Sequence, residues 1–154
     1  MTLPLKLIEC PRDAMQGILQ FIPTEEKIAY LNQLLKVGFD TLDFGSFVSA
    51  KAIPQMWDTS LVCEALEGYS GPTKLLAIVA NKRGAEDAAQ FKQIDYLGYP
   101  FSISESFQLR NTNSTIEESI LRVQEILDIA LKHNKELIIY NSMAFGNPYG
   151  DLWN

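Results

Sequence analysis

The chain has 154 residues, of which 47% are hydrophobic and 21% are charged, a composition typical of one globular domain. Its formal net charge of −6 argues against binding to the phosphate backbone of nucleic acid, and no apolar run reaches the roughly 20 residues that a membrane span needs. Two cysteines give no disulfide framework and the start lacks the features of a signal peptide, so we expect a cytoplasmic protein with neither nucleic acid nor membrane as a partner.

Apolar runs of strand length alternate with segments of helical periodicity along the chain. We expect strands at residues 5–10, 41–44, 74–80, 94–99 and 136–140. We expect helices at residues 24–37, 58–66, 83–91 and 114–133. Thr24 is the predicted N-cap of the first helix, and Ser114 with Glu117 is the predicted capping box of the longest. Residues 45–57 and 100–113 are expected to be loops.

This alternation predicts a parallel α/β sheet with right-handed crossovers. Both an open doubly wound sheet and a (β/α)₈ barrel fit it, but no glycine-rich phosphate-binding motif follows the first strand, which disfavours a dinucleotide-binding fold. A closed barrel takes roughly 250 residues. We therefore predict an incomplete TIM barrel of about five parallel strands with flanking helices, forming a single domain over residues 1–154.

Ligands of parallel α/β folds bind beyond the carboxyl ends of the strands, so the polar side chains at those ends are the candidates for a site. Among them are Arg12, Asp13 and Gln16 after the first strand, Asp43 and Ser46 at the second, Arg110 and Asn111 after the fourth, and Tyr140 and Ser142 at the end of the fifth. A carboxylate can hold a hard divalent cation, and a guanidinium beside it can stabilise an oxyanion.

Each candidate also has a purely structural interpretation. Arg12 and Asp13 could be a solvated loop pair, and Asp43 could face solvent on an edge strand. Asn111 could be only a turn former, and Tyr140 a core aromatic with its hydroxyl at the rim. His133, the single histidine, follows the longest predicted helix and is expected at the opposite rim, away from the site.

Several motifs closely resemble hydroxymethylglutaryl-CoA lyase, a member of the DRE-TIM metallolyase superfamily. The likeness spans nearly the whole chain and is densest at residues 8–16, 45–56, 111–119 and 146–150. The Arg12–Asp13 motif marks the wider superfamily. The stretch Ser46-Phe-Val-Ser-Ala-Lys51 is specific to the lyase branch and argues against a related acyl-CoA synthase or aldolase.

The resemblance implies a metal-dependent cleavage of hydroxymethylglutaryl-CoA to acetyl-CoA and acetoacetate, a step of leucine degradation. It implies Mg²⁺ or Mn²⁺ as cofactor, with Asp13 as metal ligand and Arg12 stabilising the enolate. Asp43 stands where the family usually has a catalytic glutamate near the substrate. The positions in or near the family's acyl-CoA pocket are Gln16, Ser46, Asn111, Tyr140 and Ser142.

The sequence also departs from the family pattern. The family's metal site uses a His-x-His pair and an asparagine from later strands, and a cysteine from a glycine-rich loop, and we find none of these segments here. Residues 17–20 lack the charged side chains often seen there, which leaves the contacts to CoA phosphates unassigned. We therefore expect a lyase that is competent only with a missing carboxy-terminal half or as a homo-oligomer. The alternative is a non-catalytic half-barrel that self-associates.

Overall fold

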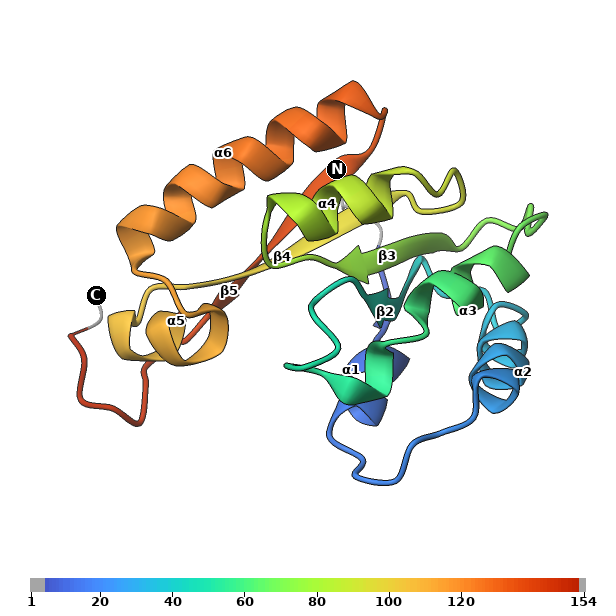
Figure 1. Cartoon of the computed structure of the whole chain (residues 1–154), viewed down its shortest axis with the longest axis horizontal. Coiled ribbons are helices and arrows are strands. Elements are labelled where there is room, and N and C mark those ends of the chain that lie inside the picture. Colours follow the sequence, from blue (N-terminus) through green and yellow to red (C-terminus); the bar gives the residue numbers. More distant parts are fainter. Residues whose placement is uncertain (1–4, 153–154) are drawn as a thin grey trace.

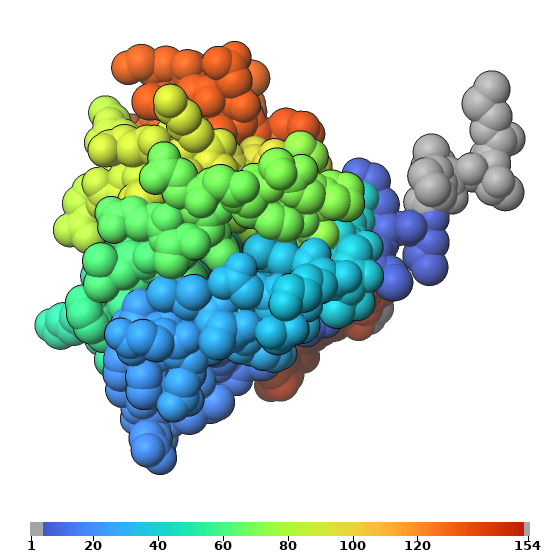
Figure 2. Space-filling model, turned by 90° about the vertical axis from the view of Figure 1, so that its right-hand side faces the viewer, coloured from blue at the N-terminus to red at the C-terminus, as the bar shows by residue number. Residues whose placement is uncertain are grey.

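The computed structural model describes residues 5–152, which form one sheet of five parallel strands. The strands follow each other in chain order across the sheet, and every neighbouring pair is parallel. They are β1 (Ile8–Glu9), β2 (Thr41–Ser46), β3 (Lys74–Ile78), β4 (Tyr96–Ser102) and β5 (Glu136–Ser142). Successive units stack in the order of the sequence, as the colours of Figure 2 show. The prediction of about five parallel strands is confirmed.

Six α-helices and one 3₁₀ turn connect the strands (Figure 1). They are α1 (Pro11–Gln16), α2 (Thr24–Leu34), η1 (Pro54–Met56), α3 (Thr59–Ala65), α4 (Lys82–Ala89), α5 (Glu105–Thr112) and α6 (Ile116–Lys132). The short helices α1 and α5 lie on the same side of the sheet in Figure 1, after the carboxyl ends of β1 and β4. They therefore flank the region where the sequence predicts a site.

The two faces of the sheet have different roles, because side chains alternate along each strand. Leu42 and Phe44 of β2 point outward into a core shared with α2, α3, α4 and α6. Asp43, between them, points to the inner face and is fully buried. Its interpretation as a solvent-facing residue is therefore wrong. A register shift between Asp43 and Gly45 marks an irregularity in β2 at this point.

Two predicted loop segments contain helices. Pro11 begins α1 directly after β1, so Arg12 and Asp13 lie on a helical turn, where a first-turn proline is well tolerated. The loop expected at residues 100–113 is wrong as well. β4 continues to Ser102, and α5 begins after Ser104, whose hydroxyl accepts a hydrogen bond from the backbone N–H of Phe107.

Both predicted helix caps are wrong by one residue. Pro23 occupies the N-cap position of α2, and the hydroxyl of Thr24 donates to Asp58 instead. The capping box of α6 is formed by Thr115 and Glu118. Its neighbour Ser114 is buried, with its hydroxyl 2.7 Å from that of Ser119.

Over residues 5–152, none of the helices combines the length and the apolar character needed to cross a bilayer.

Candidate active site

A cavity of about 700 Å³ opens at the carboxyl ends of the strands. Its volume lies in the range of ligand-binding pockets. It is lined by segments from α1, the loop after β2, β3, β4, α5 and β5. The predicted site residues in its wall are Arg12, Asp13, Gln16, Asn111, Tyr140 and Ser142.

Arg12 is the centre of a polar cluster in this wall. Its Nε and Nη2 donate to the two carboxylate oxygens of Asp43, at 3.1 and 2.6 Å. Its Nη1 donates to Asp13 at 3.0 Å and to the amide oxygen of Gln16 at 2.9 Å. The structure thus brings Arg12, Asp13, Gln16 and Asp43 together, although Asp43 lies 31 residues from Arg12 in sequence. An interpretation of Arg12 as a solvated loop residue does not hold, because its side chain is only 11% exposed.

The contact between Arg12 and Asp43 is a buried, bidentate ion pair. Burial raises the pKa of Asp43, and the hydrogen bonds and charge of Arg12 oppose that rise. Burial also acts to lower the pKa of Arg12, but the bonds to Asp43 outweigh it and raise this pKa. A bidentate arginine–carboxylate contact favours the charged form of both partners. Asp43 therefore fixes the position of a charged guanidinium at the cavity wall.

Asp13 is the exposed carboxylate of the cluster, with 64% of its side chain accessible. Its Oδ1 accepts hydrogen bonds from Arg12 and from Nε2 of Gln16, at 3.0 Å each, and Oδ2 receives none from the residues that the structure describes. That oxygen is free to bind a cation. However, residues 5–152 contain no group of three or more His, Cys, Asp or Glu side chains that could hold a metal. The donor set fits one position of a Mg²⁺ or Mn²⁺ site and not a complete site.

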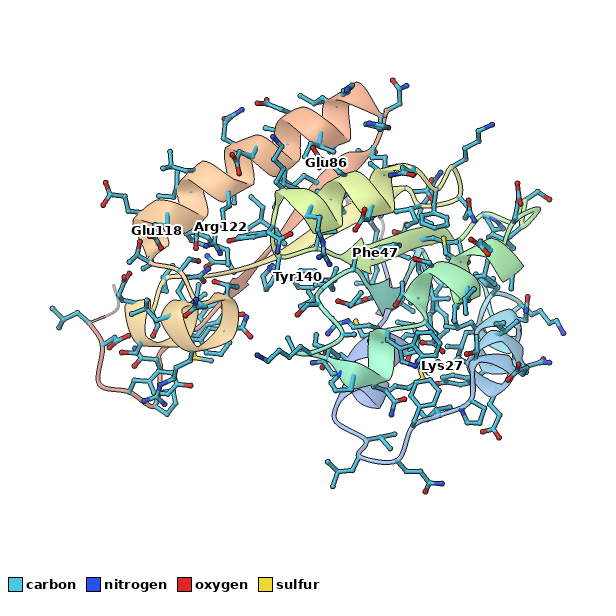
Figure 3. The ribbon with its side chains drawn as sticks, in the orientation of Figure 1. Lys27, Phe47, Glu86, Glu118, Arg122 and Tyr140 are labelled. Carbon is cyan, nitrogen blue, oxygen red and sulfur yellow. The ribbon has the colours of Figure 1, made fainter. Side chains whose placement is uncertain are left out.

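Tyr140 points from β5 into the same interior, near the middle of the molecule in Figure 3. Its ring lies against Gly98 of β4, where an added Cβ would come within 3.1 Å of the tyrosine Cε2. Its hydroxyl is buried and has no hydrogen-bond partner among the described residues. Burial raises the pKa of Tyr140, and the charge of Asp43 adds to this rise. The side chain thus presents a protonated, unpartnered hydroxyl beside the Arg12 cluster.

The remaining predicted residues have different positions. Asn111 is exposed on α5 and Ser142 is half-buried at the end of β5, and both line the cavity. Ser46 is buried outside the cavity lining, and its hydroxyl accepts a hydrogen bond from the backbone N–H of Val48 at 3.2 Å. The geometry therefore gives Ser46 a turn-forming contact. Cys10 is near the cluster, where burial, followed by the charge of Asp43, raises the pKa of its thiol.

The cavity is also lined by Arg110, one of the polar residues at the predicted strand ends, and by Phe107, which the sequence did not predict. They lie three residues apart on α5, so they share a helix face with Asn111. The sequence does contain a signal for this helix, because Ser104 followed by Glu105 is a typical helix start. The interpretation of residues 100–113 as a loop concealed this helix face.

A buried polar cluster behind the cavity holds the loop between α1 and α2. The side chain of Gln55 accepts a hydrogen bond from Ile22 N at 2.9 Å and donates to the carbonyl groups of Ile18 and Gln20. Lys27 points inward from α2 and pairs with Asp58 at 2.8 Å while also donating to the Gln55 carbonyl group (Figure 3). The loop beside Gly17, at the cavity wall, is therefore fixed by side chains that do not line the cavity.

A second cavity, of about 690 Å³, lies at the opposite ends of the strands. His133 lines it together with Lys74 and Asp95, which form an ion pair at 2.8 Å. The histidine is thus on the rim opposite the Arg12 cluster, as predicted.

Comparison with known proteins shows which proteins this chain is similar to in sequence. No family model matches the chain. The cytoplasmic 3-hydroxy-3-methylglutaryl-CoA lyase of Rattus norvegicus is 34% identical over 148 residues, which are 94% of this chain and 42% of that protein. The hydroxymethylglutaryl-CoA lyase of Bacillus subtilis (strain 168) is 34% identical over 139 residues, or 90% of this chain and 46% of that protein. This chain therefore spans about half the length of the curated relatives it matches.

Solved structures give the same result. A crystal structure of HMG-CoA lyase from Bacillus subtilis matches with a TM-score of 0.89 and 32% identity, over 100% of this chain and 52% of that chain. An HMG-CoA lyase from Acinetobacter baumannii, in complex with coenzyme A and 3-methylmalate, matches with a TM-score of 0.88 and 28% identity, over 100% and 51%. The resemblance to hydroxymethylglutaryl-CoA lyases and the incomplete TIM barrel are both confirmed.

Proposed function

We propose that this chain supplies the Arg12–Asp13 side of an active site that cleaves hydroxymethylglutaryl-CoA to acetyl-CoA and acetoacetate. The observation that carries the proposal is the Arg12 cluster: a guanidinium fixed by buried Asp43 next to the exposed carboxylate of Asp13, at a cavity beyond the strand ends. The likeness to lyases in sequence and fold supports the choice of substrate. The cytoplasmic location stays a prediction, because relatives named cytoplasmic and relatives named mitochondrial both match the chain.

The reaction requires stabilisation of negative charge. The substrate's tertiary hydroxyl loses its proton, the carbon–carbon bond breaks to leave acetoacetate, and the electron pair of that bond forms the enolate of acetyl-CoA, whose carbon then takes up a proton. Arg12 would stabilise the enolate oxygen, because its charge is fixed before the substrate binds. The unpartnered hydroxyl of Tyr140 would donate a hydrogen bond to the substrate, with Gln16, Asn111 and Ser142 completing the wall.

Asp13 would hold Mg²⁺ or Mn²⁺ through Oδ2, and the cation would polarise the substrate oxygens when bound. The other ligands would come from outside the residues described, either from a carboxy-terminal half of the barrel or from another copy of the chain. The cofactor proposal therefore predicts weak metal binding by the chain alone and stronger binding when the substrate adds its own oxygens.

Isothermal titration of the chain with hydroxymethylglutaryl-CoA, with Mg²⁺ present or removed by EDTA, tests this proposal. We expect metal-dependent binding that Asp13→Ala weakens. Asp128→Ala, which removes an exposed carboxylate on the outer helix α6, is the matched control and should bind like the wild type. If the wild-type chain does not bind the thioester at all, the proposed function is wrong.

Release of acetyl-CoA, measured by liquid chromatography, separately tests the need for more of the barrel. We expect no turnover by the chain alone, because the metal ligands in residues 5–152 are incomplete. Turnover that Asp13→Ala abolishes would support the lyase function and contradict the requirement for further strands.

The open edge of the sheet supports a second candidate, a half-barrel that associates with itself. Among the described strands β5 pairs only with β4, and Ile139 on β5 and Phe145 just after it are 46% and 95% exposed. Unpaired edges with apolar side chains promote association. Size-exclusion chromatography with light scattering should give a defined dimer or higher oligomer if this is the role, and a monomer would contradict it.

A further inference from the structure

The second arginine of the cavity, Arg110, has no partner of opposite charge among the described residues. Two arginines and one aspartate line the cavity, and the aspartate, Asp13, already pairs with Arg12. No carboxylate in residues 5–152 lies within ion-pair distance of Arg110, and its guanidinium donates no hydrogen bond to the described residues. No direct ion pair with a described residue therefore neutralises the guanidinium of Arg110.

Arg110 is nevertheless held in place. Its guanidinium carbon lies 4.7 Å from the centre of the Tyr149 ring, a cation–π contact. The guanidinium donates no hydrogen bond to the described residues, so its N–H groups remain available to a ligand. An arginine that merely extended into solvent would not need such a support.

The support itself is fixed to α5. Asn147 accepts hydrogen bonds from the backbone N–H groups of Tyr149 and Asp151, at 3.0 Å each. The carboxylate of Asp151 accepts from the hydroxyl of Ser104 and from the backbone and side chain of Ser106, at the start of α5. The turn that carries Tyr149 thus docks on the same helix that carries Arg110. Asp151 is engaged in this contact; its carboxylate is close enough to Arg110 for the two charges to attract, but the two side chains form no direct ion pair.

We propose that Arg110, supported by Tyr149, binds an anionic phosphate or carboxylate group of the ligand, opposite the Arg12–Asp13 cluster. The inference rests on the proposed function, since an acyl-CoA carries phosphates at one end and the hydroxymethylglutaryl group adds a carboxylate at the other. It supplies a cation to a pocket whose residues 17–20 carry no charge. Arg12 does not serve as this cation, because Asp13, Gln16 and Asp43 already occupy four of its N–H groups.

Two ligands separate the possible anions in a calorimetric titration of the full chain. Acetyl-CoA carries the phosphates without a free carboxylate, and 3-hydroxy-3-methylglutarate carries carboxylates without phosphate. We expect Arg110→Ala to weaken binding of one of them at least about tenfold, the loss of one charge-assisted hydrogen bond. If Arg110→Ala weakens binding of acetyl-CoA alone, the group that Arg110 binds is a phosphate. If it weakens binding of 3-hydroxy-3-methylglutarate alone, that group is the carboxylate of the acyl chain.

The variants distinguish ligand binding from a structural role. Arg110→Lys keeps the charge but loses the planar stacking, so its loss should be smaller than that of the alanine variant. Tyr149→Leu should weaken ligand binding when Arg110 is present. In the Arg110→Ala variant the same substitution should cause little further weakening, because Tyr149 acts through the arginine. Arg83→Ala, on the exposed face of α4, is the matched control and should leave both affinities unchanged.

The salt dependence gives a second measurement that a structural role would not change. Binding to the wild type should weaken as salt is raised from 50 to 500 mM, and the Arg110→Ala variant should show a flatter dependence. The inference is overturned if Arg110→Ala, with an unchanged circular dichroism spectrum, binds both ligands within twofold of the wild type. If the wild type binds neither ligand, the proposed function fails first and the inference fails with it.

Discussion

Replacement of Asp43 tests whether the buried ion pair fixes Arg12. Asp43 has no exposed surface and Arg12 keeps only 11% of its side chain accessible, so Asp43→Ala leaves a guanidinium charge in a largely dry position. Breaking a buried pair on one side costs about 3 to 5 kcal/mol. Arg12 retains its contacts to Asp13 and Gln16. We therefore expect Asp43→Ala to lower the free energy of unfolding by about 3 kcal/mol, the lower end of this range.

Urea unfolding followed by circular dichroism measures this loss. Asp43→Asn keeps one acceptor oxygen and the shape of the side chain, so its loss should be smaller, about 1 to 2 kcal/mol. The control is Asp87→Ala, which breaks the exposed pair with Arg83 and should change stability by no more than about 0.5 kcal/mol.

Two results would refute the reasoning about Asp43. The first is an Asp43→Ala variant no less stable than Asp87→Ala, which would mean that Arg12 finds water or another partner at no cost. The second concerns the double variant Arg12→Met, Asp43→Leu, in which no charge remains unpaired. It should be more stable than the sum of the two single losses predicts, and strict additivity would show that the two side chains do not interact.

Three further predictions concern positions outside the cavity. Lys27→Met leaves the buried Asp58 without a partner of opposite charge and with only the hydrogen bond from Thr24, and urea unfolding should show a loss of about 3 kcal/mol. Gly84→Ala should destabilise the protein by at least about 1 kcal/mol despite the better helix propensity of alanine, because the added Cβ would lie 2.7 Å from the carbonyl oxygen of Phe47. Thermal unfolding measures this loss, and Gly17→Ala, whose added Cβ would meet nothing within 4 Å, should cost less stability in the same experiment. The hydrogen bond from the Ser104 hydroxyl, followed by those from Ser106, lowers the pKa of Asp151 below its ordinary 3.8, so its carboxylate stabilises the folded chain above that pH. The difference in free energy of unfolding between wild type and Asp151→Asn should have its full value at pH 7 and shrink as the pH falls through the lowered pKa. A difference that does not depend on pH would contradict this prediction.

The sequence predicted the sheet, and it predicted that Asp43 points the opposite way from Leu42 and Phe44, because both depend on local patterns. Apolar runs identify buried strands, but alternation left open whether Asp43 faces solvent or the interior. The pairing of Asp43 with Arg12 could not be predicted in this way, because it joins residues 31 positions apart through the fold. Only the three-dimensional structure shows that Asp43 faces the interior and that Arg12 is its partner.

The misplaced capping box shows a different limit. Ser114 with Glu117 and Thr115 with Glu118 have the same spacing, so the local pattern fits both. The choice is made by the preceding turn, in which Asn113 adopts a left-handed conformation with a φ of 51° and ends α5. Ser114 then lies in the interior, where its hydroxyl contacts Ser119. The boundary of one helix thus depends on the end of another, which the sequence did not predict.

The hydrogen bonds of Arg12 also limit how a substrate oxyanion can be bound. A guanidinium has five N–H groups, and the described residues use four of them, two for Asp43 and one each for Asp13 and Gln16. One N–H, on Nη2, remains for a ligand without rearrangement. A second contact requires displacing Asp13 or Gln16 from Nη1, and both lie on α1 next to the cavity. Asp43 is too deeply buried to be displaced. In the proposed function, the guanidinium would therefore keep its position while its contacts on the cavity side exchange, which is the arrangement expected of a group that stabilises charge arising only during the reaction.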